Sequence, residues 1–87
     1  MIENIMSLMV DLSKVENVKT FCDITSQMTY DIDLARGNYV VDAKSIIGIM
    51  GFDLSKPIEV ILHCNSEEDY KKFLMLLDEN KIVDEGV

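Results

Sequence analysis

A short alternating segment near the middle of the chain restricts the fold more than any other feature. It consists of five residues in which apolar and acidic side chains alternate: Tyr30, Asp31, Ile32, Asp33 and Leu34. A period of two places the apolar side chains on one face of a strand and the carboxylates on the other. Residues 36–38 supply a glycine-containing turn, and residues 39–41 return as the second arm of an antiparallel hairpin. The chain must therefore cover one face of a sheet and leave the other in water.

The segments around this hairpin predict three helices and two further strands. Residues 2–10 are densely apolar and residues 58–63 alternate, so both are expected to be strands. Each helix is expected to begin at a serine N-cap: Ser13, Ser45 and Ser66. Ser13 also forms a Ser-x-x-Glu capping box with Glu16. The residues expected to face the core from the first and last helices are Val15, Val18, Phe21, Cys22, Thr25, Met28, Tyr70, Phe73, Leu74 and Leu77.

The order β-α-β-β-α-β-α predicts an α+β fold, with three helices on one face of a four-stranded antiparallel sheet. Residues 1–87 are expected to form a single domain, because no repeat or Gly/Ser linker interrupts them and the only proline is Pro57.

The charge balance disfavours several classes of partner. Eight Lys and Arg oppose sixteen Asp and Glu, and the net charge of −8 would repel nucleic acid and anionic lipid surfaces. The longest uncharged apolar run, residues 45–52, is too short to insert across a membrane. Cys22 and Cys64 are too few for a disulfide framework. We therefore expect a cytoplasmic protein in which both cysteines are thiols that pack as small apolar residues.

Few side chains could support catalysis. His63 is the only histidine, and Cys64 follows it, but neighbours on a strand point to opposite faces and cannot share a metal ion or a proton. The sequence has no Gly-rich phosphate loop, no Cys-x-x-Cys pair and no residue near His63 that would complete a Ser-His-Asp set. Asp31 and Asp33 are expected to be ordinary surface charges. We predict no enzymatic activity, no catalytic residues, no metal and no cofactor.

One segment supports a specific resemblance. Residues 44–50 read Lys-Ser-Ile-Ile-Gly-Ile-Met, which resembles the regulatory segment of HPr, the histidine-containing phosphocarrier of the bacterial sugar phosphotransferase system, roughly Leu-Lys-Ser-Ile-Met-Gly-Val-Met. Residues 31–34, 37–42 and 57–60 fall into the same register without gaps, so the resemblance covers essentially the whole chain. It implies an open-faced β-sandwich, in agreement with the element order above.

The same register shows where the chain departs from the family. The family's active loop, Gly-[Leu/Ile]-His-Ala-Arg-Pro, falls on residues 12–17, where the histidine is replaced by Lys14, the arginine by Glu16 and the proline by Asn17. A phosphoryl group there would meet a carboxylate instead of a guanidinium, so the usual phosphoryl transfer is expected to fail. A shift of register does not restore it, because His63 is the only imidazole.

The resemblance also assigns roles to residues 45–50. Ser45 stands where a dedicated kinase phosphorylates the family's regulatory serine, and a helix N-terminus suits an added phosphate. Asp42 would oppose the new charge, and Lys44 would partly offset it. Partner proteins are expected to dock on three apolar residues: Ile46, Ile47 and Met50. Alternatively, Ser45 is only an N-cap while Ile46 and Ile49 pack inward.

We therefore expect an HPr-like regulatory or adaptor protein of the phosphotransferase system family that lacks histidine phosphotransfer. Its partners would be phosphotransferase-system or regulatory proteins, including a serine kinase, bound through residues 45–50. Two alternatives remain. One is a small-ligand or oligomer-forming sensor module on the same scaffold, and the other is a phosphocarrier with an atypical acceptor. The sequence leaves the partner and the oligomeric state open.

Overall fold

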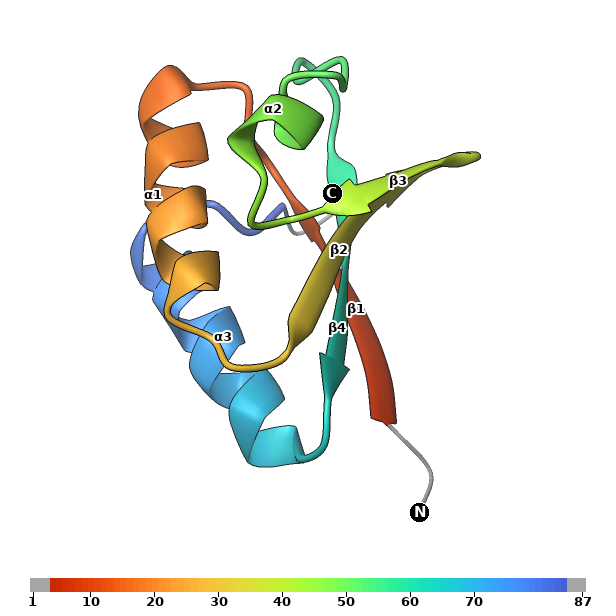
Figure 1. Ribbon diagram of the computed structural model, residues 1–87. Coiled ribbons are helices and arrows are strands. Elements are labelled where there is room, and N and C mark those ends of the chain that lie inside the picture. Colours follow the sequence, from red (N-terminus) through yellow and green to blue (C-terminus); the bar gives the residue numbers. More distant parts are fainter. Residues whose placement is uncertain (1–3, 85–87) are drawn as a thin grey trace.

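The computed structural model describes residues 4–84, which form four strands and three helices in the predicted order (Figure 1). The elements are β1 (Asn4–Val10), α1 (Val15–Ser26), β2 (Asp31–Arg36), β3 (Tyr39–Asp42), α2 (Ile46–Ile49), β4 (Ile58–Cys64) and α3 (Glu67–Glu79). Ile2 and Glu3 of the predicted first strand lie outside the described residues. None of the helices in residues 4–84 combines the length and the apolar character needed to span a membrane.

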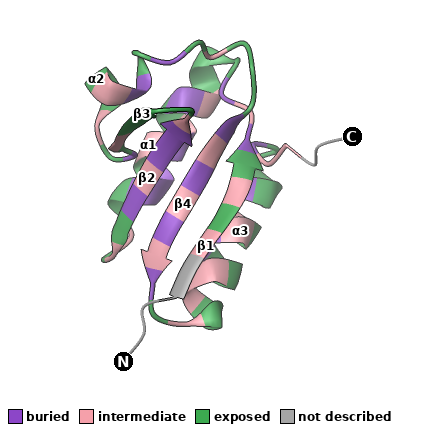
Figure 2. Ribbon diagram, turned by 90° about the vertical axis from the view of Figure 1, so that its right-hand side faces the viewer, coloured by how far each residue is buried: buried purple, intermediate pink, exposed green. Residues whose placement is uncertain are grey.

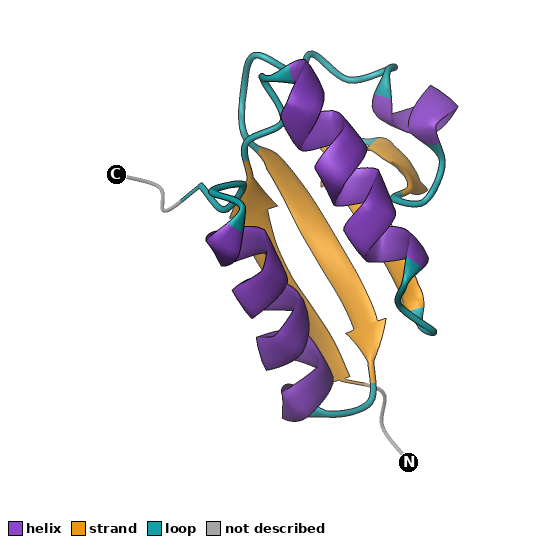
Figure 3. Ribbon diagram, turned by 90° about the vertical axis from the view of Figure 1, so that its left-hand side faces the viewer, coloured by secondary structure: helices purple, strands orange, loops and turns teal. Residues whose placement is uncertain are grey.

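The strands form one antiparallel sheet in the order β1-β4-β2-β3. β2 and β3 are joined by the predicted turn, in which Gly37 adopts a φ of 60° that favours glycine. The helices cover one face of the sheet (Figures 1 and 3), and the other face is open (Figure 2). The prediction of an open-faced α+β fold is confirmed.

The hydrophobic core lies between the helices and the covered face of the sheet. β4, in the interior of the sheet, alternates buried and partly exposed residues along its whole length (Figure 2), as its sequence pattern predicts. Phe21 of α1 and Phe73 of α3 meet edge to face, with ring centroids 6.4 Å apart. The largest fully buried side chains are Phe21, Phe73, Leu12, Ile32, Leu34, Ile49, Ile58, Leu62, Leu77, Ile82, Val10 and Val60.

Two of the three predicted serine N-caps are confirmed, and one is wrong. Ser45 accepts a hydrogen bond from the backbone N–H of Gly48, and Ser66 accepts one from that of Asp69, each at 3.2 Å. α1 instead has Lys14 as its N-cap residue, without a side-chain cap. The hydroxyl of Ser13 donates to Asp11 Oδ1 at 2.6 Å. The capping box fails because the nearby carboxylate engages Ser13 in a local turn.

The inward face of α1 also differs from the expectation. Val18, Phe21 and Thr25 are buried as predicted, but Ile24 joins them and Val15 is 79% exposed. Val15 is the first residue of the helix, and its side chain points away from the core although Leu12 just before it is fully buried. The expected stripe was therefore extended one turn too far.

The two cysteines behave as predicted, as free thiols that pack with apolar residues. Cys64 is fully buried in the core, and Cys22 is partly buried against it. Burial, with a smaller contribution from Asp23, raises the pKa of the Cys22 thiol. A raised pKa keeps the thiol protonated and chemically inert.

Tyr30, in the segment between α1 and β2, forms a hydrogen bond to α3, and we expect its ionisation to lower stability at alkaline pH. Its hydroxyl donates to the backbone oxygen of Asp69 at 3.3 Å, and burial, followed by Cys64 and Asp69, raises its pKa from 10.0 to about 12. Between these values the native state keeps a proton that the unfolded chain has lost, so stability should fall as pH rises through this window. Urea unfolding at several pH values between 9 and 12 tests this, with Tyr30→Phe as the matched variant. An equal slope in both proteins would contradict it.

Candidate functional site

The start of α1 is where the family resemblance places the phosphorylated histidine. Lys14 and Glu16 are both exposed there. Just before them, the Asp11 carboxylate accepts hydrogen bonds from the side chain and backbone of Ser13, which, together with nearby Lys14, hold its pKa below the usual range. The segment thus presents an ammonium and carboxylates instead of an imidazole and a guanidinium. A lysine ammonium only donates hydrogen bonds and has no electron pair with which to attack phosphorus.

His63 lies far from the start of α1. Val10, which leads toward α1, pairs with Ile58 at the beginning of β4, and His63 is five residues further along that strand. Five strand residues span roughly 16 Å. Cys64 is fully buried on the covered side of the sheet, whereas His63 is partly exposed on the other. This confirms that the two side chains point to opposite faces.

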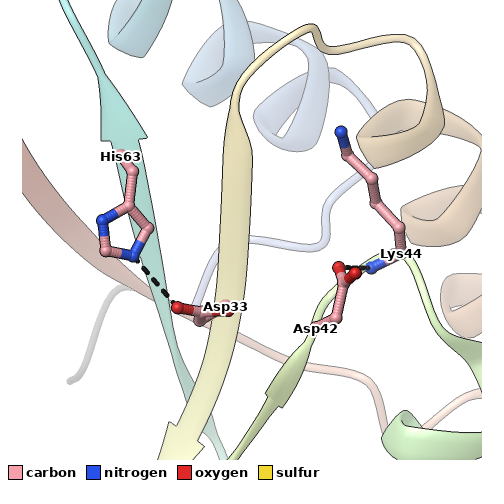
Figure 4. Close-up of polar contacts among 4 residues, drawn as sticks. All are labelled: Asp33, Asp42, Lys44 and His63. Atoms are coloured by element: carbon pink, nitrogen blue, oxygen red, sulfur yellow. Dashed lines mark hydrogen bonds and ion pairs between the residues drawn. The ribbon is translucent and has the colours of Figure 1, made fainter.

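The sheet gives His63 a carboxylate partner that was not predicted. His63 Nε2 lies 3.0 Å from Asp33 Oδ2, which projects from the neighbouring strand β2 (Figure 4). Asp33 in turn faces Asp42 across the β2–β3 pair. Asp33 was not predicted as the partner of His63 because thirty residues separate the two in sequence. Within residues 4–84, no group of three or more His, Cys, Asp or Glu side chains is placed to hold a metal ion.

The sequence suggested that Lys44 would offset a phosphate on Ser45, but the Lys44 ammonium does not point toward Ser45. Its ammonium donates to the carbonyl of Met28 at 3.0 Å, just beyond the end of α1. Its backbone N–H donates to Asp42 Oδ1 at 2.8 Å (Figure 4). Compensation of a phosphate on Ser45 by Lys44 would therefore require the ammonium to leave Met28.

Ser45 stabilises α2 as its N-cap, so its replacement should have a measurable cost. Ser45→Ala removes the acceptor for the Gly48 N–H and should lower the free energy of unfolding by about 1 kcal/mol. Ser26→Ala, at the exposed last residue of α1, is the control and should have a smaller effect. Urea denaturation measures both. Equal effects would show that the cap contributes nothing specific.

α2 turns one isoleucine inward and leaves three apolar residues outside. The alternative interpretation was that Ile46 and Ile49 both pack inward. For Ile49 it is correct, because this side chain is fully buried. For Ile46 it is wrong, since this side chain is 51% exposed. Ile47 and Met50 are 84% and 62% exposed, so the residues expected to dock partners are accessible. Exposed apolar side chains gathered in one place are typical of interaction surfaces.

These side chains border an open groove between α2 and the start of α1, which we call the apolar groove. It has a volume of about 490 Å³. Its lining consists of Leu12, Ser13, Val15, Val18, Lys19, Ile46, Ile47, Met50 and Leu54. The sequence identified only the contribution of α2. Leu12, Val15, Lys19 and Leu54 were missed because their place beside α2 depends on how the helices pack. The one sequence feature that could have indicated this part of the groove is Val15, an apolar residue immediately after the N-cap of α1.

Comparisons with known proteins agree with this fold. No family model matches the chain, and no curated protein matches its sequence. Among solved structures, HPr-C-His from Thermoanaerobacter tengcongensis is 21% identical, with a TM-score of 0.67, and the match covers 85% of this chain and 92% of that one. The phosphocarrier protein HPr from Bacillus anthracis str. Ames is 20% identical, with a TM-score of 0.63, over 84% and 94%. The chain therefore has the fold of HPr phosphocarrier proteins.

Proposed function

We propose that this chain is an HPr-like, non-enzymatic regulatory or adaptor protein of the cytoplasm, which binds phosphotransferase-system or regulatory proteins without relaying phosphate through a histidine. The observation that carries the proposal is the apolar groove. Val15, Ile46, Ile47 and Met50 are all at least half exposed and border the same depression. Burial of apolar surface contributes about 25 cal/mol per Å², so a partner that covers these side chains would gain affinity there.

The charges beside the groove indicate the chemistry of the partner. Lys19 is the only charged residue in the lining, and exposed Lys14 lies between the lining residues Ser13 and Val15. Asp11 and Glu16 place two carboxylates beside these two ammonium groups, so residues 11–19 carry no net charge, in contrast to the net charge of −8 for the whole chain. A partner with apolar anchors would therefore meet less electrostatic repulsion at this face than elsewhere on the acidic surface.

The chemistry at the start of α1 supports the proposal that the phosphate relay is lost. Glu16 is exposed in the first turn, where a developing phosphate would need a cation. At an effective dielectric of 20, two unit charges 4 Å apart interact by about 4 kcal/mol, and exchange of a guanidinium for a carboxylate reverses the sign. This favours an adaptor over a phosphocarrier with an atypical acceptor.

Ser45 is the proposed site of regulatory phosphorylation by a serine kinase. It is partly exposed and lies next to Ile46 and Ile47, so a phosphate there would add negative charge to the rim of the apolar groove. Phosphorylation would therefore change which partners bind. Incubation with ATP and the serine kinase of the phosphotransferase system should add one phosphate to wild type and none to Ser45→Ala, as read by mass spectrometry. A phosphate elsewhere would contradict the assignment of Ser45.

The adaptor role is tested by NMR titration of the isotope-labelled chain with the general phosphotransferase enzyme and with the serine kinase. We expect amide shifts confined to residues 12–19 and 45–54, which contain the lining of the groove. Shifts confined to the open face of the sheet, or no binding to either protein, would overturn the proposal.

A second candidate function is a small-ligand sensor, because the volume of the groove lies in the range of ligand pockets, roughly 300–1,000 Å³. A ligand that binds only the native state raises the midpoint of thermal unfolding. A melt of the purified chain against a metabolite panel separates the candidates. A raised midpoint with one metabolite favours the sensor, and no change across the panel favours protein partners.

A further inference from the structure

Besides α1 and α2, a segment without helix or strand contributes to the lining of the apolar groove. Residues 50–57 connect α2 to β4, and they supply Met50 and Leu54 to the lining. An irregular segment of this length loses considerable conformational entropy when it is held in one arrangement. Contacts from elsewhere must therefore fix it if the groove exists before a partner arrives.

Arg36, at the end of β2, supplies three of these contacts. Its Nη1 donates to the carbonyl of Asp53 at 2.9 Å. Its Nη2 donates to the carbonyls of Lys56 and Pro57 at 2.7 and 2.8 Å. The guanidinium carbon also lies 5.7 Å from the centroid of the Phe52 ring. One side chain thus binds both ends of the stretch that contains Leu54, and only the rigid guanidinium fork offers donors in this arrangement.

Tyr39, the first residue of β3, holds the other end of the segment. It faces Arg36 directly across the hairpin. Its ring packs edge to face against Phe52, with centroids 4.7 Å apart, and its hydroxyl lies 3.4 Å from the carbonyl of Gly48. A Cβ on Gly51 would collide with the Tyr39 hydroxyl, so the chain passes this residue with no room to spare. Because Gly51 directly follows Met50, this close contact with Tyr39 restricts the position of the Met50 backbone.

We propose that Arg36 and Tyr39 are positioning residues, a hairpin clamp that holds Met50 and Leu54 in place and keeps the apolar groove formed in the free protein. The inference rests on the proposed function, since it concerns the same groove. It assigns the β2–β3 hairpin, which does not line the groove, to the upkeep of the binding surface. Arg36 is the only arginine of the chain, and its side chain points to this segment rather than to a phosphate site.

The test compares Arg36→Lys with wild type, with Lys56→Ala as the matched control. Lys56→Ala removes a positive charge from the same segment but keeps the backbone carbonyl that Arg36 binds. Arg36→Lys should speed hydrogen exchange at the amides of Phe52 and Ser55 by about tenfold, with no change at Val60 and Leu62 in the core strand. Unchanged core amides also show that the variant is folded. Tyr39→Phe, which keeps the ring, should have a smaller effect.

The second readout is occupancy of the groove by 1-anilinonaphthalene-8-sulfonate, an apolar anion suited to a groove with Lys19 in its lining. Wild type and Lys56→Ala should bind it with shifts at the methyl groups of Ile46, Met50 and Leu54. Arg36→Lys should bind it several-fold more weakly. Equal affinity for all three proteins, or no binding by wild type, would overturn the clamp.

Neither readout requires a partner protein, so the clamp and the proposed function can fail separately. If the exchange and dye results are as expected but no partner binds, only the proposed function is contradicted. If partners bind and Arg36→Lys behaves like wild type, only the clamp is contradicted.

Discussion

Replacement of Ile47 by aspartate is expected to remove partner binding and leave the fold intact. The Ile47 side chain is 84% exposed in the free protein, so the substitution breaks no core contact. In the complex it would place a carboxylate where an apolar surface is covered, and an unpaired buried charge is costly. Anchors of this kind contribute about 2 kcal/mol or more, which corresponds to at least a roughly 30-fold loss of affinity. Isothermal titration with whichever of the two proposed partners binds wild type measures the change.

The control for this variant is Val40→Asp. Val40 is 55% exposed on β3, outside the lining of the apolar groove, and the substitution adds the same charge to the chain. Ile47→Asp should keep the urea midpoint of wild type, Val40→Asp should remain folded although aspartate is unfavourable in a strand, and only Ile47→Asp should lose affinity. A loss of equal size in both would show that net charge, and not the groove, governs binding. A loss below about threefold for Ile47→Asp would contradict its assignment as an anchor.

The double variant Lys14→His, Glu16→Arg is expected to gain phosphoryl acceptance from phosphoenolpyruvate through the general phosphotransferase enzyme. Both positions are exposed, so folding should be unaffected. The histidine supplies the nucleophile, and the arginine supplies a cation for the transferred phosphoryl group. A single preorganised electrostatic contact contributes about 100-fold to a rate, so transfer should exceed the wild-type background by at least that factor. Mass spectrometry over a time course measures the gain.

The single variant Lys14→His separates the two contributions. It has the nucleophile but retains Glu16, whose carboxylate would repel the phosphoryl group, so it should accept phosphate more slowly than the double variant. Equal rates would show that Glu16 does not oppose transfer. If the double variant bound the enzyme through the apolar groove and still accepted no phosphate, the loss would have to lie elsewhere than at these two positions.

Local patterns predicted the fold well because, in a small sheet with one solvent-exposed face, apolar and polar residues alternate along each strand. The alternation in β2 and β4 fixed which side chains enter the core, and glycine at position 37 marked the hairpin. Ser45 and Ser66 follow the cap pattern, and each accepts the expected backbone hydrogen bond. At Ser13 the same pattern failed, because the Ser13 hydroxyl donates a hydrogen bond to the carboxylate of Asp11, two residues earlier.

The parts that sequence could not predict depend on contacts between distant segments. Asp33 meets His63 only because β2 and β4 are neighbours in a particular register. Val15 was assigned to the core because periodicity alone does not show where a helix emerges from it. No sequence pattern indicates the role of Arg36, because that role depends on three carbonyls in a segment about twenty residues away. The resemblance located α2, but the groove required the packing of α1 beside it.

The most direct measurement is the intact mass of the wild-type chain after incubation with phosphoenolpyruvate and the general phosphotransferase enzyme. The Lys14→His, Glu16→Arg variant, treated in parallel, serves as the positive control. With Lys14 at the position that the family resemblance assigns to the histidine, and the only histidine held by Asp33 on the open face of the sheet, we expect an unchanged mass. The addition of one phosphate to the wild-type chain would contradict the account.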